Sequence, residues 1–183
     1  VENYVYVQFL GICPFLGVSK NLKTAMGMSV AVIFVMVLAT AVTWPINHFI
    51  LETYHLDYLQ TLVFILIIAA LVQLVETFMK RYMVPLYNAL GIYLPLITTN
   101  CIVLGVVLLN VQSGYGFTES MVNSIGGGLG FLLAMFMFSG IRSRIDESDI
   151  PDFLSGLPIT LIAAGIAALS FQGFVGIAEN LFT

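Results

Sequence analysis

Long apolar stretches alternate with short polar segments along almost the whole chain of 183 residues. About 20 apolar residues in a helix cross the ~30 Å hydrocarbon core of a bilayer. The pattern therefore predicts an all-α polytopic membrane protein, a single membrane domain over residues 1–183 with six transmembrane helices. The helices are expected at about residues 1–18, 24–50, 59–79, 84–111, 117–141 and 154–177. Because the chain begins with Val1 inside an apolar stretch, we expect the start of the first helix to be missing.

The fourth stretch has polar residues at its centre. Pro95 removes a backbone donor, and the run Thr98, Thr99 and Asn100 leads directly to Cys101. Freed backbone groups at membrane depth are tolerated only where protein or a cavity satisfies them. The stretch therefore predicts a broken helix, interrupted at residues 95–100, that holds a thiol inside the membrane.

The second cysteine, Cys13, lies in a matching frame. Residues 13–18 (CPFLGV) and 101–106 (CIVLGV) share the pattern C-x-x-L-G-V. This match suggests two repeats of three helices, residues 1–81 and 82–183, with helices one and four both broken near their cysteines. Because each repeat has an odd number of helices, the second repeat crosses the membrane in the opposite orientation to the first. Such inverted repeats place their broken helices at a shared site near the midplane. We therefore expect Cys13 and Cys101 to approach each other.

The composition and the charge pattern fit a membrane protein. The chain is 60% hydrophobic and 9% charged, whereas a soluble domain carries about 25% charged residues. Cytoplasmic connections collect Lys and Arg, so the connections after helices one, three and five are expected in the cytoplasm and both termini outside. We expect the lipid bilayer, and no nucleic acid, as a partner. The basic residues are Lys20, Lys23, Lys80, Arg81, Arg142 and Arg144.

Two membrane cysteines allow three interpretations. They can pack as small apolar residues, form a redox disulfide, which is rarely stable on the cytoplasmic side, or bind a soft metal. A [2Fe–2S] cluster needs four thiolates, and the two histidines, His48 and His55, lie at the outer end of helix two and in its loop. Metal binding therefore requires a partner with two more cysteines, most simply a second subunit of the same architecture.

Other polar residues in the apolar stretches are less specific. Intramembrane carboxylates often mark ion pathways, so Glu76, together with Thr98 and Asn100, forms a possible ion path. An ion pair between Glu76 and Lys80, one turn later, is a sufficient structural alternative. The glycine-rich residues 126–130 are interpreted as a site of close helix packing.

Four segments carry a resemblance to a known family. Residues 10–20 (LGICPFLGVSK), 22–28, 86–109 and 163–174 resemble the A subunits of Rnf complexes, and the likeness covers nearly the whole chain. That family is related to the E subunit of the sodium-pumping NADH:quinone oxidoreductase. The CPF after residues 10–12, and TTNC followed by VLGV, are more similar to the Rnf members.

The resemblance implies a subunit of a ferredoxin:NAD⁺ oxidoreductase that pumps Na⁺ or H⁺ across the prokaryotic cytoplasmic membrane, with no complete active site of its own. It implies that Cys13 and Cys101 join two cysteines of the homologous E-type subunit to hold a [2Fe–2S] cluster. Flavin, ferredoxin-like and NADH-binding Rnf subunits are the other implied partners. Residues expected to shape the surroundings of the cluster are Gly11, Ile12, Pro14, Thr99 and Asn100.

Three alternatives remain. The chain could be an E-type subunit of the quinone reductase, or a scaffold whose cysteines are incidental. It could also be a non-redox secondary transporter with a midplane site lined by Thr98, Thr99, Asn100 and Glu76. A transporter would stay active when its cysteines are replaced by serine, whereas the redox hypothesis predicts loss of activity.

Overall fold

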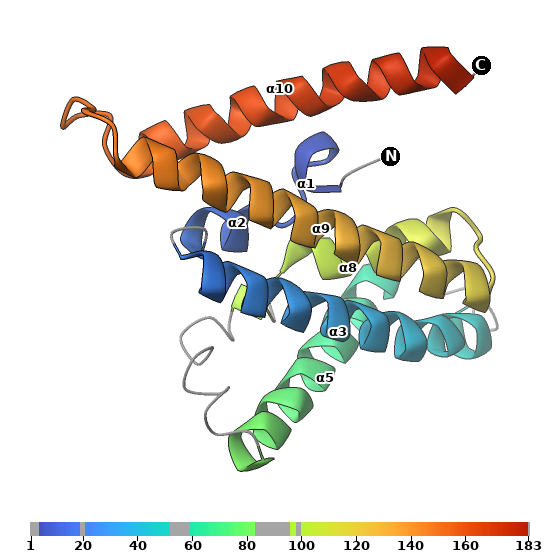
Figure 1. Ribbon diagram of the computed structural model, residues 1–183. Coiled ribbons are helices and arrows are strands. Elements are labelled where there is room, and N and C mark those ends of the chain that lie inside the picture. The colour runs from blue at the N-terminus through green and yellow to red at the C-terminus, as the bar shows by residue number, and fades with distance from the viewer. Residues whose placement is uncertain (1–3, 19–20, 52–58, 83–95, 98–99, 183) are drawn as a thin grey trace.

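The computed structural model describes residues 4–18, 21–51, 59–82, 96–97 and 100–182. All regular structure in these residues is helical, which confirms the predicted all-α class. In chain order the elements are α1 (Tyr4–Val7), α2 (Ile12–Val18), α3 (Leu22–Ile46), the π-helical segment η1 (Asn47–Leu51), α5 (Gln60–Tyr82), α8 (Cys101–Gln112), α9 (Phe117–Asp146) and α10 (Leu157–Phe182) (Figure 1).

Four helices in the described residues are long and apolar enough to cross a membrane. They cover Leu22–Phe49, Gln60–Tyr82, Phe117–Asp146 and Leu157–Phe174, of which the shortest has 18 residues. At 1.5 Å per residue, about 18 residues extend ~27 Å, close to the hydrocarbon thickness. These helices correspond to the predicted spans two, three, five and six.

The first predicted span is broken, as expected. Helices α1 and α2 are separated by four residues, Gln8–Gly11, that are not helical. The amide of Leu10 donates to the carbonyl oxygen of Tyr4 at 3.0 Å, which closes the end of α1. The break places a helix start immediately before Cys13.

The fourth predicted span is described only in part. Helix α8 begins at Cys101, directly after the polar run that is expected to interrupt the span. Pro95, Thr98 and Thr99 lie outside the described residues, so the role predicted for Pro95 stays a prediction.

Three helix ends differ from the predicted limits. Helix α9 continues from 141 to Asp146, so Arg142 and Arg144 lie within it and do not close it. Helix α5 likewise runs through its terminal basic residues, and α10 covers Leu157–Phe182 instead of 154–177. Charged residues end an apolar run but do not break a helix, because their long side chains are good helix formers.

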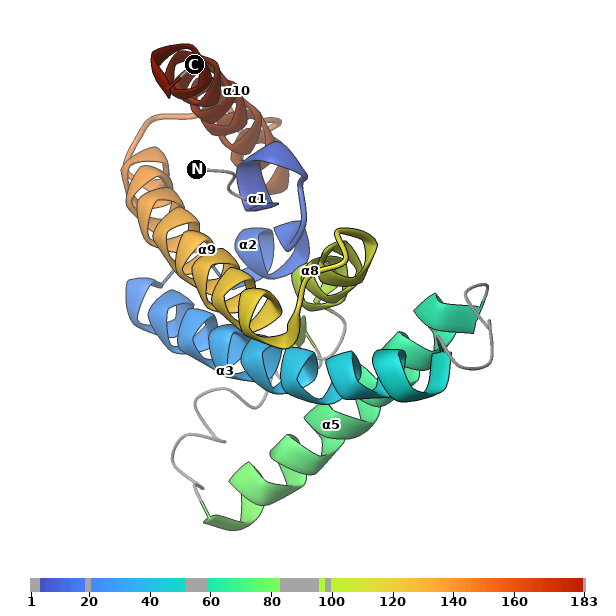
Figure 2. The ribbon, with the colours of Figure 1, turned by 90° about the vertical axis from the view of Figure 1, so that its right-hand side faces the viewer.

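Helix α9 packs against α3 and α1 through small residues. A Cβ atom added to Gly128 would lie 2.8 Å from Cγ1 of Ile33, and one added to Gly127 would lie 2.8 Å from Cε2 of Tyr4. At these two positions the packing interpretation of the glycine-rich stretch is confirmed. Seen end-on, α1 and α2 are surrounded by α3, α8, α9 and α10 (Figure 2).

The basic helix ends lie on one side of the molecule. The start of α3 and the end of α9 lie at the left of Figure 1, and the end of α5 lies at its lower left. This agrees with alternate connections sharing a side. That this side faces the cytoplasm, and that the two halves are inverted repeats, stay predictions.

Candidate cofactor site at the two cysteines

Asn100 builds the N-terminus of α8. Its extended backbone (φ −70°, ψ 113°) precedes the helix, and its side-chain Oδ1 accepts a hydrogen bond from the amide of Ile102 at 3.3 Å. Such a cap satisfies one of the free amides at a helix start. Cys101 is therefore the first residue of α8, where the amides of the first helical turn point toward its side of the helix.

Gly11 connects the two cysteine segments. Its amide donates to Sγ of Cys101 at 2.9 Å, across 90 positions of sequence. Gly11 is buried with φ +85°, a conformation that favours glycine, and an added Cβ would lie 3.1 Å from Cε2 of Phe131. Both the backbone angle and the space therefore require a glycine where the amide meets the thiol.

Cys13 lies two residues after this contact, as the second residue of α2. It is exposed, whereas Cys101 is half-buried, and both are free thiols. Pro14 is buried and Ile12 half-buried. The structure thus brings together the segments of both predicted ligands, with Gly11, Ile12, Pro14 and Asn100 around them. Thr99 lies outside the described residues.

The glycine of each C-x-x-L-G-V frame faces a leucine that precedes the other cysteine. A Cβ on Gly105 would lie 2.6 Å from Cδ1 of Leu10, so a larger residue here would require the Leu10 side chain to move. Gly17 faces Leu96 at an ordinary contact distance, with its added Cβ 3.9 Å from Cδ1. Both frame glycines therefore contact the other segment, but only Gly105 lies where the packing is close.

Arg142 holds the far end of α2. Its Nη1 donates to the carbonyl oxygen of Leu16 at 2.6 Å, and the residue is 7% exposed. The last carbonyls of a helix have no partner within it, so this bond ties α2 to α9. From the sequence, Arg142 is expected only as a charge in a connection. Its position at the end of a continuous apolar run is the one pattern that could have suggested a buried role.

A buried polar network was also not predicted. Thr40 and Ser124 share a hydrogen bond of 2.7 Å between their hydroxyls, and Nδ2 of Asn110 donates to Oγ of Ser124 at 3.3 Å. Asn123 donates to Oδ1 of Asn110 at 2.6 Å, and the Tyr4 hydroxyl donates to Asn123 at 3.1 Å. These bonds link α1, α3, α8 and α9, and they satisfy polar groups that would be costly to bury alone.

The predicted ion path is not assembled by the described residues. Glu76 is half-buried on α5, and its carboxylate makes no hydrogen bond or ion pair within the described part of the chain. Asn100 is buried at the start of α8, and Thr98 lies outside the described residues. The path therefore stays a prediction.

The donor set fits one half of a four-thiolate site. Two thiols come from neighbouring segments, and no group of three or more His, Cys, Asp or Glu residues gathers within the described residues. Nδ2 of Asn100 is shielded from solvent and has no hydrogen-bond partner there. An amide donor without a partner on the residue directly before Cys101 is compatible with a sulfur-rich group held between this chain and another.

Comparison with known proteins places the chain in a family. A family model described as "Rnf-Nqr subunit, membrane protein" matches residues 1–178. The chain belongs to the Rnf-Nqr family. It is 57% identical over 176 residues to the A subunit of the Na(+)-translocating ferredoxin:NAD(+) oxidoreductase complex of Acetobacterium woodii, covering 96% of this chain and 92% of that protein.

Other relatives of this Rnf-Nqr chain carry a similar description. It is 52% identical over 180 residues to the A subunit of the ion-translocating oxidoreductase complex of Syntrophotalea carbinolica, and 50% identical over 179 residues to that of Pectobacterium atrosepticum. Each alignment covers 98% of this chain and 93% of the relative. The resemblance to Rnf A subunits is thereby confirmed.

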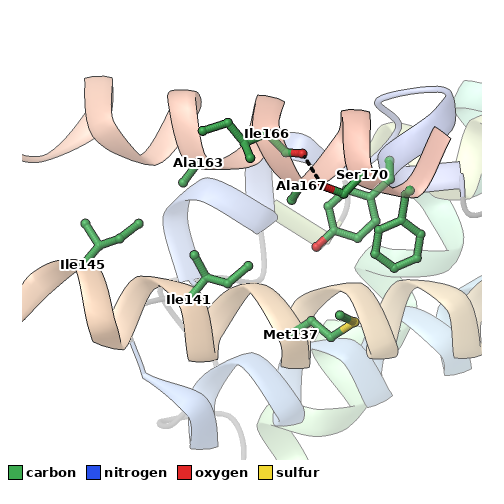
Figure 3. Close-up of a pocket in the computed structure, with 9 residues that line it drawn as sticks. Met137, Ile141, Ile145, Ala163, Ile166, Ala167 and Ser170 are labelled. Atoms are coloured by element: carbon green, nitrogen blue, oxygen red, sulfur yellow. Dashed lines mark hydrogen bonds between the residues drawn. The ribbon is translucent and has the colours of Figure 1, made fainter. Parts of the chain in front are cut away.

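A cavity elsewhere in the Rnf-Nqr chain has few polar groups that could bind or react with a ligand. It has a volume of about 390 Å³ and lies between α9 and α10, lined mainly by aliphatic side chains such as Ile141, Ile166 and Ala163 (Figure 3). The Ser170 hydroxyl that lines it already donates to the carbonyl oxygen of Ile166 at 3.0 Å. None of the predicted site residues lines this cavity.

Proposed function

We propose that this Rnf-Nqr chain is the A-type membrane subunit of an ion-translocating ferredoxin:NAD⁺ oxidoreductase complex. In that complex Cys13 and Cys101 supply two of the four thiolates of a [2Fe–2S] cluster shared with a homologous E-type subunit. The observation that carries the proposal is the 2.9 Å hydrogen bond from the Gly11 amide to Sγ of Cys101. It joins the segments of two cysteines that are far apart in sequence.

The exposed break in the first span supports a protein partner at this face. Gln8, Phe9 and Cys13 are exposed, and Phe9 has φ +56°. Irregular backbone facing lipid leaves polar groups unsatisfied, so at membrane depth it must be covered by protein. An E-type subunit that contributes two cysteines would cover this break and complete the ligand set.

The chain's own residues would hold and shield the ligands. The Gly11 amide would hold Sγ of Cys101 in place through its 2.9 Å hydrogen bond. Ile102 and Phe131, each 0% exposed, exclude water on the inner side of this contact. Arg142 fixes α2 and therefore the position of Cys13. A [2Fe–2S] cluster, when bound, supplies one-electron transfer.

The names of the relatives support the reaction class. The Acetobacterium woodii protein is named for Na⁺ translocation and for ferredoxin:NAD⁺ oxidoreduction, so Na⁺ is the ion to test first, with H⁺ as the alternative. The complex would include flavin, ferredoxin-like and NADH-binding subunits in the prokaryotic cytoplasmic membrane. Glu76, Thr98 and Asn100 remain proposed ion-path residues.

The test uses the whole complex in sealed vesicles. We expect Cys13→Ser and Cys101→Ser each to abolish both NAD⁺ reduction by ferredoxin and the coupled ion uptake, because each removes one ligand. Assembly of the complex, measured by copurification of the other subunits, is the control. Ion uptake that persists in either variant would contradict the proposal and favour a transporter without redox chemistry.

A further inference from the structure

Asn100 is more than an N-cap. The residue is 3% exposed, and among the described residues only one of its two side-chain heteroatoms has a hydrogen-bond partner. Oδ1 accepts from the Ile102 amide at 3.3 Å, while Nδ2 has no partner among the described residues. Buried side-chain amides in proteins are almost always paired, so an unpaired NH₂ group needs an explanation.

The orientation of the amide is fixed by its neighbour. The Ile102 amide can only donate, so the atom facing it must be the oxygen, and exchanging Oδ1 and Nδ2 would put two donors together. The free NH₂ group is therefore a property of the fold. It belongs to the residue directly before Cys101.

Capping does not require this NH₂ group. Ser, Asp and Asn cap helices about equally well, because each offers an oxygen to the free amides. Asn differs from the other two in carrying an N–H donor on the same side chain as its capping oxygen. The Asn100 side chain lies close to the segment of the other cysteine, since an added Cβ on Gly11 would lie 3.5 Å from Oδ1 of Asn100.

We propose that the Asn100 side-chain amide donates a hydrogen bond to a sulfur atom of the cofactor held by Cys13 and Cys101, and thereby raises its reduction potential. This inference rests on the proposed function. Hydrogen bonds to cluster sulfurs stabilise the form with the extra negative charge. Gly11 would supply one donor through its backbone and Asn100 a second through its side chain.

The test compares the wild-type complex with Asn100→Ser, which keeps a capping oxygen and loses the NH₂ group. In a redox titration followed by EPR, one electron passes from dithionite to the iron core and the amide proton stays on nitrogen. At a fixed solution potential we expect the ratio of reduced to oxidised cluster to fall about tenfold in the variant. For a one-electron couple this corresponds to a shift of about −59 mV.

A second measurement looks for the hydrogen bond directly in the wild-type complex. Wild-type complex labelled with ¹⁵N in the asparagine side chains should show a hyperfine coupling between nitrogen and the reduced cluster, and Asn100→Ser should remove it. An unchanged potential in the variant, or no such coupling in the wild type, would overturn the inference. Absence of any cluster signal from the wild-type complex would instead overturn the proposed function, so the two failures are distinguishable.

Discussion

At the scale of single residues, Gly11 meets three requirements at once. It takes a left-handed backbone angle, it leaves no room for a side chain beside Phe131, and its amide reaches the Cys101 thiol. Its importance was predictable, because it lies two positions before a cysteine in a segment that resembles a known family. The hydrogen bond to Cys101 was not predictable, since no local sequence pattern indicates a contact between residues 90 positions apart.

Gly11→Ala is expected to destabilise the complex by about 1–2 kcal/mol, the usual cost of a left-handed conformation for an L-residue. It should also shift the EPR signal of the proposed [2Fe–2S] cluster, because the Gly11 amide moves relative to Sγ. Thermal denaturation and EPR of the purified complex measure the two effects. Gly27→Ala is the matched control, since a Cβ there meets nothing within 4 Å. Equal behaviour of the two variants would contradict this role of Gly11.

At the scale of helices, α2 depends on α9. The short helix has seven residues, too few to be stable alone, and Arg142 binds its last turn through the Leu16 carbonyl. Arg142→Met is expected to cost about 1–3 kcal/mol, because it removes the charged donor from a half-buried carbonyl. It should also lower the iron content of the complex by loosening Cys13.

The matched control for Arg142 is Arg144→Met on the same helix. Arg144 is exposed, and its Nη1 lies 3.9 Å from Oε2 of Glu147, a long distance for an ion pair. Surface changes of this kind lie within about ±0.5 kcal/mol. Thermal midpoints in detergent compare the two variants, and an equal loss of stability in both would show that the bond to Leu16 is unimportant.

The contact between α3 and α9 gives another test. Gly128→Ala places a Cβ 2.8 Å from Cγ1 of Ile33, which is too close, whereas Gly126→Ala meets nothing within 4 Å. We expect Gly128→Ala to lower stability by about 1–3 kcal/mol through overpacking. Gly126→Ala should be neutral or slightly stabilising, because alanine favours helix. A thermal shift of the same size in both variants would contradict this packing of α3 on α9.

Helices were easier to predict than their ends. The four long helices follow from apolar stretches of membrane length, and the break in the first span follows from the frame shared by both cysteines. The sequence predicts the end of α9 at Ile141, where the apolar pattern stops, whereas the helix runs five residues further to Asp146. The network through Asn110, Ser124 and Thr40 was missed, because it depends on which faces of three helices meet.

At the scale of the whole molecule, the chain has two sides that the sequence distinguishes by charge. Basic residues gather at the start of α3 and the ends of α5 and α9, on one side of the molecule. If that side is cytoplasmic, Ser148→Cys between α9 and α10 should react with a maleimide only after the cells are opened. Ser113→Cys, in the turn between α8 and α9, should react in intact cells. The reverse pattern would invert the predicted topology.

The reactivity of the two cysteines tests where the partner subunit binds. Cys13 is exposed and Cys101 half-buried in the single chain. We expect Cys13 to react faster than Cys101 with a membrane-permeant thiol reagent in cells that lack the E-type partner. Both should be protected in the assembled complex. Equal reactivity of Cys13 with and without the partner would place the interface elsewhere.

The proposed role of Cys13 and Cys101 as ligands of half a [2Fe–2S] cluster is best tested by iron analysis with EPR on the purified complex. Wild type is compared with Cys101→Ser under reducing, anaerobic conditions. We predict that the variant assembles but lacks one [2Fe–2S] signal and about two iron atoms per complex, the content of one such cluster. An unchanged spectrum and unchanged iron content in the variant would refute the ligand role and leave both cysteines with a purely structural one.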